Sequence, residues 1–290
     1  MSAGKEIRSK IKSVQNTQKI TRAMQMVATS KMRKTQELMR ASRPYAENVR
    51  RVVANLARLG SYSRNMTSFL RAPTEITRVG IVLVTTDKGL CGGLNTNTLK
   101  LFYEKIQTLH ASEIEVEACV LGHKGFNYVN KLGLSVCGSA VGLGDIPKMD
   151  KLVGPLSGVL NKFYNCELDA VYIIYSQFIN TMKQKPVCEK LLPLTEKDLH
   201  LESGSVKDYL YEPNPTEVLE GVIRRYVESV AYQCVADNMA SEQASRMIAM
   251  KSATDNAGSA INELKLAYNK SRQASITKEL AEIVSGSSAV

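Results

Sequence analysis

Residues 79–93 read VGIVLVTTDKGLCGG, and this stretch indicates the architecture in the middle of the 290-residue chain. Residues 79–85 form a nearly continuous apolar run, which is typical of a strand buried on both faces of a parallel sheet. A glycine-rich turn follows and leads into a segment at 97–109 with helical periodicity. A buried strand, a tight turn and a helix in this order predict an α/β unit.

The alternation continues on the C-terminal side of this stretch. Further strands are predicted at 116–121, 170–175 and 186–192, with helices at 124–132 and 152–163. Because Pro186 opens the last strand and cannot donate to a ladder, that strand is expected at an edge. Strand–helix alternation predicts a mostly parallel, Rossmann-like sheet.

Both ends of the chain predict very long helices. Residues 5–59 contain no Gly and only Pro44, and residues 216–285 contain no Pro and only Gly221 and Gly258. Apolar residues recur at steps of three and four, for example Ile20, Met24 and Val27. About 55 and 70 helical residues correspond to lengths of ~80 and ~105 Å. Pro44 either kinks the first helix or marks a short break in it.

Two such helices around one domain favour an antiparallel coiled coil. The second helix is rich in Ala along its middle, so we expect a thin shaft, with the end of the longer helix projecting alone. The sequence therefore divides into a first coiled-coil helix at 1–60, a linker at 61–76, an α/β domain at 77–212 and a second helix at 213–290.

The net charge of +10 is concentrated in the first helix. Residues 1–60 hold fourteen Lys and Arg against three Asp and Glu, whereas the rest of the chain is close to neutral. Such a segment favours an acidic partner, which could be nucleic acid, an anionic membrane surface or acidic protein loops. A basic coiled coil that binds nucleic acid is thus one alternative, although Tyr45 is the only aromatic residue among the first 60.

The turn at 85–95 lies where ligands bind in open α/β sheets. It matches neither the P-loop nor the dinucleotide-binding pattern, so a close-packed strand-to-helix turn is the simpler interpretation. Asp87 and Lys88 are then surface charges or partner contacts. A small-molecule enzyme using Lys88 or Cys91 is a second alternative, and it leaves the long helices unexplained.

Cysteine and histidine usage predicts neither a metal site nor a disulfide framework. The six Cys and three His are scattered along the chain, and no two Cys form a CxxC pair. We expect free thiols and no bound cofactor.

Four motifs carry a resemblance to a known family. They are ITRAMQMVATSKM at 20–32, TDKGLCGGLN at 86–95 and SEQASRMIAMKSATDN at 241–256, and a fourth, NKSRQASITKEL, follows at 269–280. The chain resembles the gamma-subunit family of F-type ATP synthases, bacterial type, over essentially its whole length.

This resemblance implies a rotor subunit that is not itself catalytic. Its coiled coil would turn as an asymmetric axle in a ring of three alpha and three beta subunits, coupling proton flow to ATP synthesis or hydrolysis. MgATP and ADP would be bound by those partners. The α/β domain would contact the epsilon subunit and the c-ring, on the cytoplasmic face of the bacterial inner membrane, touching the membrane only indirectly and binding no nucleic acid.

The resemblance also assigns roles to individual residues. Contacts to beta subunits fall on Arg22, Met24, Lys31, Arg33, Arg246, Gln273, Thr277 and Glu279, although Met24 could instead pack in the helix seam. An apical apolar sleeve would receive Ile276, Leu280, Ile283 and Val284. The foot near the c-ring and epsilon would include Tyr209, Tyr211 and Glu212. The family's central loop corresponds to Asp87, Lys88, Gly89, Cys91, Gly92 and Gly93.

Overall fold

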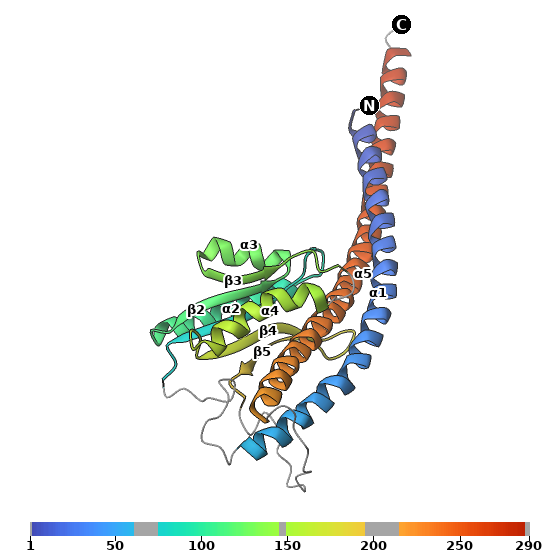
Figure 1. Ribbon diagram of the computed structural model, residues 1–290. Helices are drawn as coiled ribbons and strands as arrows, with labels where there is room; N and C mark the ends of the chain where they lie inside the picture. Colours follow the sequence, from blue (N-terminus) through green and yellow to red (C-terminus); the bar gives the residue numbers. More distant parts are fainter. Residues whose placement is uncertain (1, 61–74, 145–148, 195–214, 288–290) are drawn as a thin grey trace. The chain divides into compact units, whose positions relative to one another are not determined.

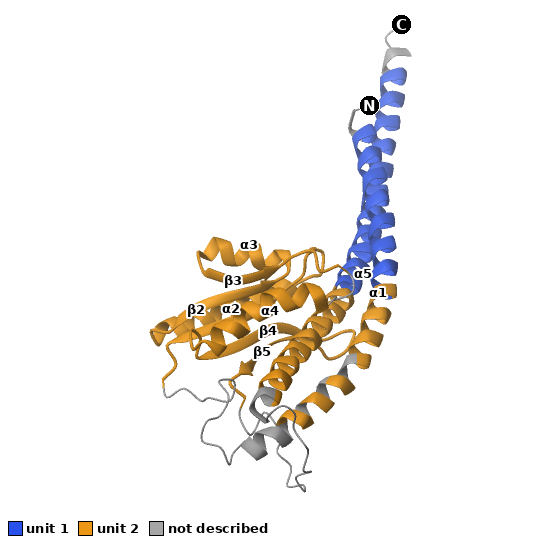
Figure 2. Cartoon of the chain, in the orientation of Figure 1, with its two compact units in different colours: residues 1–29, 246–290 blue, residues 30–245 orange. Residues whose placement is uncertain are grey.

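The computed structural model describes residues 2–60, 75–144, 149–194 and 215–287, which form two compact units (Figure 2). Unit 1 comprises Met1–Thr29 and Arg246–Val290, and unit 2 comprises Ser30–Ser245. Most of the linker predicted at 61–76 and the domain boundary predicted near 212 lie outside the described residues.

Unit 2 is built on one five-stranded sheet (Figure 1). Its strands are β1 (Arg78–Val84), β2 (Glu115–Leu121), β3 (Ser135–Ala140), β4 (Ala170–Phe178) and β5 (Gln184–Leu192). Their order is β3-β2-β1-β4-β5; the first four strands pair in parallel and β5 pairs antiparallel with β4. The predicted Rossmann-like sheet and the edge position of the last strand are both confirmed.

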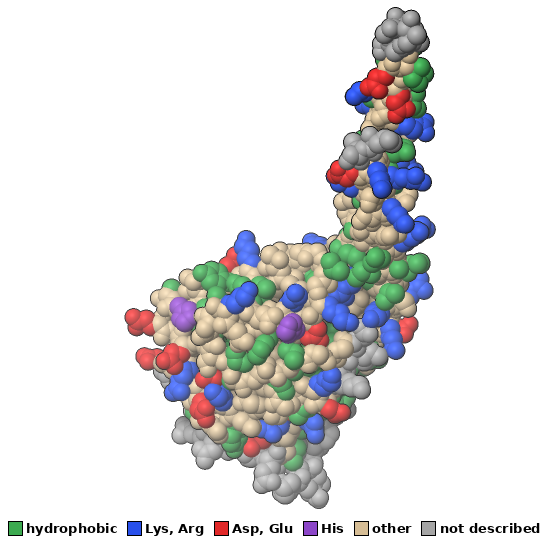
Figure 3. All heavy atoms as spheres, turned by 90° about the horizontal axis from the view of Figure 1, so that it is seen from above, with side chains coloured by type: hydrophobic (Ala, Val, Ile, Leu, Met, Phe, Trp, Pro, Cys, Tyr) green, Lys and Arg blue, Asp and Glu red, His purple; other side chains and the backbone are tan. Residues whose placement is uncertain are grey.

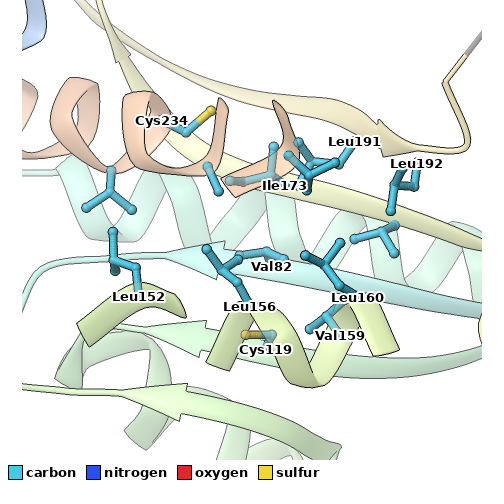
Figure 4. Packing of buried hydrophobic residues seen from close by; sticks show 14 of the residues in the cluster. Val82, Cys119, Leu152, Leu156, Val159, Leu160, Ile173, Leu191, Leu192 and Cys234 are labelled. Carbon is cyan, nitrogen blue, oxygen red and sulfur yellow. The ribbon is translucent and has the colours of Figure 1, made fainter. Parts of the chain in front are cut away.

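Helices cover both faces of this sheet. Helices α2 (Leu94–Ala111) and α3 (His123–Leu132) pack on one face, and α4 (Met149–Tyr164) packs on the other with the unit-2 part of α5 (Pro215–Ser287). Within β1, Ile81 and Leu83 join the α2 side while Val82 and Val84 join the α4 side. Figure 4 shows Val82 on the α4 side, near Leu156. The central strand is continuously apolar because neither face of it meets water.

The strand β3 was absent from the sequence prediction. Its sequence, SVCGSA, contains Val136 as its one large aliphatic residue, and its burial pattern shows no fully buried position. An outer strand with one neighbour needs little apolar surface, so hydrophobic periodicity gives a weak signal for it.

Unit 1 is an antiparallel pair made by the first part of α1 (Ser2–Gly60) and the last part of α5. Gln18 donates from its amide to the Thr254 carbonyl at 3.3 Å, whereas a Cβ at Gly4 would lie 3.9 Å from Tyr268. Residues earlier in α1 therefore contact residues later in α5, so the two helices run antiparallel. The end of α5 continues past the start of α1, with residues 272–284 all exposed (Figure 1). The predicted coiled coil and its projecting end are confirmed, and α1 runs through Pro44 without a break.

The buried face of α1 differs from the predicted stripe. Ile20 and Val27 belong to the apolar steps that predict the helix, yet they are exposed, whereas Thr21, Ala28, Met32, Thr35 and Met39 are buried. Thr21, Ala28 and Thr35 repeat every seven residues, which is the period of a coiled-coil seam. Small and hydroxyl residues can occupy it because the facing helix is rich in Ala and supplies hydroxyl partners: the Thr21 and Thr254 hydroxyls lie 2.7 Å apart.

Candidate interaction surfaces

The exposed end of α5 carries the predicted sleeve residues. Ile276, Leu280, Ile283 and Val284 are exposed by 48, 57, 67 and 65%. They recur at steps of four and three, so they lie along one side of the helix. A contiguous row of exposed aliphatic side chains on a projecting helix is a candidate interaction surface, because exposed apolar patches mark sites where partners bind.

The outer face of α1 combines cations with exposed apolar residues. Arg22 and Arg33 are exposed and Lys31 is half-buried. Beside them Ile20, Met26 and Val27 are 61, 62 and 54% exposed. Figure 3 shows basic and hydrophobic side chains side by side along the helices. None of the three is a candidate from sequence alone, because Ile20 and Val27 count only among the apolar steps that predict the helix and Met26 lies outside those steps.

The other predicted beta-contact residues occupy different environments. Gln273, Thr277 and Glu279 are exposed on the projecting part of α5. Met24 is half-buried, in keeping with its alternative role in seam packing. Arg246 is buried, with 9% of its surface exposed, so its guanidinium can offer little area to a partner.

A polar groove lies between the two helices of unit 1. Arg22 and Lys251 bring cations to it, Asp255 brings one carboxylate, and the rest is amide, hydroxyl and glycine; its lining is Gln18, Arg22, Gln25, Lys251, Thr254, Asp255, Gly258, Ser259 and Asn262. Gly258 permits the close approach of the helices, because a Cβ there would lie 3.2 Å from the Gln18 amide nitrogen.

The central loop of unit 2 is a tightly bonded turn with one exposed apolar tip. Asn95 accepts from the Thr86 N–H at 3.2 Å and donates to the Thr86 hydroxyl at 2.7 Å, while that hydroxyl donates to the Lys88 carbonyl at 2.6 Å. Cys91 is 2% exposed and its carbonyl accepts from the Ser245 hydroxyl at 2.6 Å. Leu90, with a φ of 62°, is 61% exposed. The packed-turn interpretation holds, and burial of Cys91 removes the access that a nucleophile needs.

Asp87 ties this loop to its neighbours. Its carboxylate accepts backbone N–H bonds from His123 at 3.1 Å, Gly142 at 3.1 Å and Leu143 at 2.8 Å. His123 opens α3, whose preceding Gly122 provides no side-chain cap. A carboxylate at a helix N-terminus satisfies unpaired donors and the helix dipole together. Asp87 is therefore an internal connector and more than a surface charge.

Strongly shifted pKa values occur in the packed interior of unit 2. Burial raises the pKa of Tyr175, whose hydroxyl lies 3.1 Å from a Glu189 carboxylate oxygen. Burial also raises the pKa of Cys234 on α5 well above its ordinary value. Both side chains belong to the core between the sheet and α5, so the shifts report desolvation in packing.

Some predictions concern residues without a described structure. Tyr209, Tyr211 and Glu212 lie outside the described residues. Within the part of the chain that the structure describes, no three His, Cys, Asp or Glu side chains are grouped to hold a metal ion. In that same part, every helix falls short of the length and apolarity that crossing a membrane requires.

Comparisons with known proteins define first the class and then the family. A family model described as ATP synthase matches residues 3–290. The chain is 57% identical to the ATP synthase gamma chain of Chromobacterium violaceum over 290 residues and 56% identical to that of Aromatoleum aromaticum over 293 residues, covering 100% of each protein. The chain belongs to the ATP synthase gamma chain family.

Solved structures support the same fold. The chain is similar to a chain of the Euglena gracilis mitochondrial ATP synthase, at a TM-score of 0.67 and 19% identity, covering 99% of this chain and 94% of that one. A chain from the central stalk and c-ring structure of the Tetrahymena thermophila enzyme gives a TM-score of 0.63 at 24% identity, covering 81% and 99%. The architecture of helix, α/β unit and helix is thus shared.

Proposed function

We propose that this chain is the central-stalk rotor subunit of an F-type ATP synthase, with its coiled coil turning inside a ring of three alpha and three beta subunits. Membership of the gamma chain family supports this role. The structural observation that carries it is the projecting end of α5, whose aliphatic row from Ile276 to Val284 stands exposed. An apolar sleeve around that end would bury the row.

The mechanism follows from asymmetry. Three chemically identical beta subunits would meet different sides of one shaft, so each would be stabilised in a different state. Rotation driven by proton flow would exchange those states in turn. The contacts we assign to beta subunits are Arg22, Met24, Lys31, Arg33, Gln273, Thr277 and Glu279, with Arg246 as a mainly internal member of the set.

The outer face of α1 favours protein partners over nucleic acid. A phosphate backbone is bound by cations, with aromatic residues stacking on bases where strands are single. Here the exposed cations alternate with exposed Ile20, Met26 and Val27, a mixture that suits acidic protein loops with apolar neighbours. No comparison favours a nucleic-acid role.

In this proposal the chain catalyses nothing by itself. MgATP and ADP are bound by the alpha and beta partners, and the buried Cys91 and the bonded central loop of this chain serve structure and contact. The α/β unit contacts epsilon and the polar loops of the c-ring, through a foot that includes Tyr209, Tyr211 and Glu212. The chain lies on the cytoplasmic face of the bacterial inner membrane and is peripheral to it.

The test is reconstitution with purified alpha and beta subunits, followed by native mass spectrometry and assay of MgATP hydrolysis. We expect a complex of three alpha, three beta and one copy of this chain, which hydrolyses MgATP far faster than the same subunits without it. The chain alone should show no hydrolysis. A chain that stays free beside inactive partners, yet binds DNA in a salt-dependent titration, would reverse the proposal.

A variant pair makes the test specific for the α5 end. Replacing Ile276, Leu280 and Ile283 by Ser should weaken assembly or hydrolysis, because the sleeve would then receive polar side chains. The matched control is Lys278→Ser, an exposed residue in the same segment whose ion pair with Glu282 spans 3.8 Å. Equal loss in both variants would show that the row does not act as an apolar contact.

A further inference from the structure

Two of the six free cysteines lie on neighbouring strands although 18 positions separate them in the sequence. In the β2–β3 ladder Ala118 pairs with Val136 and Cys119 pairs with Gly138, so Cys137 is an extra residue in a β-bulge. Neighbouring strands lie about 4.8 Å apart, a separation inside the ~4.4–6.8 Å range of Cα distances that disulfides span.

The bulge also turns both side chains to the same face of the sheet. Cys119 belongs to the core under α4, where its Sγ lies 3.7 Å from the Pro155 carbonyl oxygen (Figure 4). Cys137 packs against that same core, and its Sγ donates across the strand gap to the Ala118 carbonyl at 3.4 Å. Regular alternation would have sent Cys137 to the opposite face from its neighbour Gly138, which faces Pro155.

The electrostatics agree that the two thiols are close. A charge on Cys137 raises the pKa of Cys119, in addition to the larger effect of burial. The pKa of Cys137 is raised to about 11, first by burial and second by the Glu117 carboxylate, whereas the Lys162 ammonium acts to lower it. Glu117 on β2 and Lys162 on α4 are themselves an ion pair at 2.6 Å.

We infer that Cys119 and Cys137 form an oxidisable dithiol site, at which a peroxide joins β2 to β3 through a disulfide. Cys137 is half-buried and meets the oxidant first, whereas Cys119 is fully buried. The Cys137 sulfur takes one oxygen from hydrogen peroxide, giving a sulfenic acid and water. The Cys119 sulfur then attacks that sulfur, and the hydroxyl group leaves with the Cys119 proton as a second water.

The reaction is expected to be slow at neutral pH and faster in alkali. Only the thiolate is a strong nucleophile, and both thiols are held in the neutral form. As the pH approaches 11, Cys137 ionises beside Lys162 and its attack on peroxide accelerates. We therefore expect the disulfide to form under sustained oxidation and not during a brief exposure to peroxide.

Peptide mapping of the full-length chain tests the inference directly. The folded chain is treated with hydrogen peroxide, denatured in excess N-ethylmaleimide and cut with trypsin without reduction. Trypsin separates the two cysteines, because Lys124 and Lys131 lie between them. We expect peptides 106–124 and 132–148, each with a single Cys, to appear joined with the loss of two hydrogens.

A dithiol-specific probe gives a second readout. Phenylarsine oxide bridges two neighbouring thiols with loss of one water, and we expect one arsenic per chain, spanning the same two peptides. Cys137→Ala should abolish both products, and Cys119→Ala should do the same if it folds. Cys166→Ala, which removes an exposed thiol, should leave both unchanged.

Two outcomes would overturn the inference. One is peroxide converting Cys137 to sulfinic acid while Cys119 stays reactive to the maleimide after denaturation. The other is arsenic uptake that survives in Cys137→Ala. Oxidation in urea is the reference, where scrambled pairings among the six thiols should replace the single linked pair.

Discussion

The Asp87 carboxylate accepts a 2.8 Å hydrogen bond from the backbone N–H of Leu143, so the turn after β1 holds the segment that follows β3. With the bonds from Gly142 and His123, one side chain joins three connections at the carboxyl end of the sheet. Lys151 reinforces the same segment by donating to the Gly142 carbonyl at 2.6 Å. These hydrogen bonds fix the loop that carries the exposed Leu90 side chain.

Replacing this carboxylate should loosen all three connections together. For Asp87→Ala we expect a loss of about 1–3 kcal/mol in the free energy of unfolding, since three N–H donors lose a charged acceptor. Urea unfolding measures the loss, and hydrogen exchange should quicken at His123, Gly142 and Leu143. Glu104→Ala is the control, because its exposed ion pair with Lys100 at 3.9 Å contributes little. Unchanged exchange at Leu143 would contradict the role.

Gly122 should be far more sensitive to substitution than Gly133. Both have positive φ values, 108° and 69°, but a Cβ at Gly122 would overlap the Thr85 carbonyl, whereas one at Gly133 meets open space. We expect Gly133→Ala to cost about 1 kcal/mol, from the left-handed backbone alone. Gly122→Ala should cost at least ~3 kcal/mol or prevent folding. Equal costs in urea unfolding of the two variants would refute the steric account.

Much of the fold could be predicted because it rests on strong local signals. The apolar run at 79–85 predicts the strand β1, because both faces of a central parallel strand are covered and its residues are therefore apolar throughout. The absence of Gly and Pro predicted both long helices. β3 could not be found in this way, because a strand that pairs on one side and contains Gly138 has almost no hydrophobic period.

The helix seam shows the limit of periodicity on a long helix. Ile20 and Val27 have the spacing of a buried stripe, yet Thr21 and Ala28, one position later, are the buried residues. One residue turns the face by about 100°, and the buried face includes a hydroxyl pair with Thr254, 233 positions away, which local periodicity does not reveal. The role of Asp87 in joining three connections was missed for the same reason, because the three N–H groups that donate to it lie 36–56 positions further along the chain.

The stability of the chain should fall in alkali. Burial raises the pKa of Cys137 from its ordinary 9 to about 11 and also raises that of Cys234. The folded state therefore keeps protons that the unfolded state releases, so the stabilisation is complete below pH 9 and the part due to Cys137 is lost as the pH rises through 11. Urea midpoints at pH 7.5 and 10 measure the fall. The urea midpoint of the double variant with Cys137→Ala and Cys234→Ala should fall less between these two pH values. The midpoint of Cys166→Ala, which removes an exposed thiol, should fall as much as that of the wild type.

The Thr21–Thr254 pair should contribute to the helix seam as a coupled unit. Thr21→Val or Thr254→Val leaves one hydroxyl in the seam with its 2.7 Å partner removed, and each should cost about 1 kcal/mol. The double variant replaces both polar groups by methyls and should cost less than the sum of the single losses. Thermal unfolding followed by helical circular dichroism measures the cycle, and strict additivity would show that the two hydroxyls act independently.

Substitution of the exposed apolar residues of α1 distinguishes an effect on assembly from an effect on folding. Replacing Ile20, Met26 and Val27 by Ser should leave the unfolding of the isolated chain within about 1 kcal/mol of the wild type, because all three side chains are already largely in water. If this face meets the ring of alpha and beta subunits, the affinity of the chain for the ring should fall roughly a hundredfold, since each of the three lost apolar contacts weakens the interface by about 1 kcal/mol, and MgATP hydrolysis at limiting chain concentration should fall with it. The control is Leu132→Ser at the end of α3, an apolar residue that is 39% exposed, which should leave hydrolysis unchanged. Full hydrolysis by the triple variant would remove this face of α1 from the rotor contacts and leave its cations to act alone.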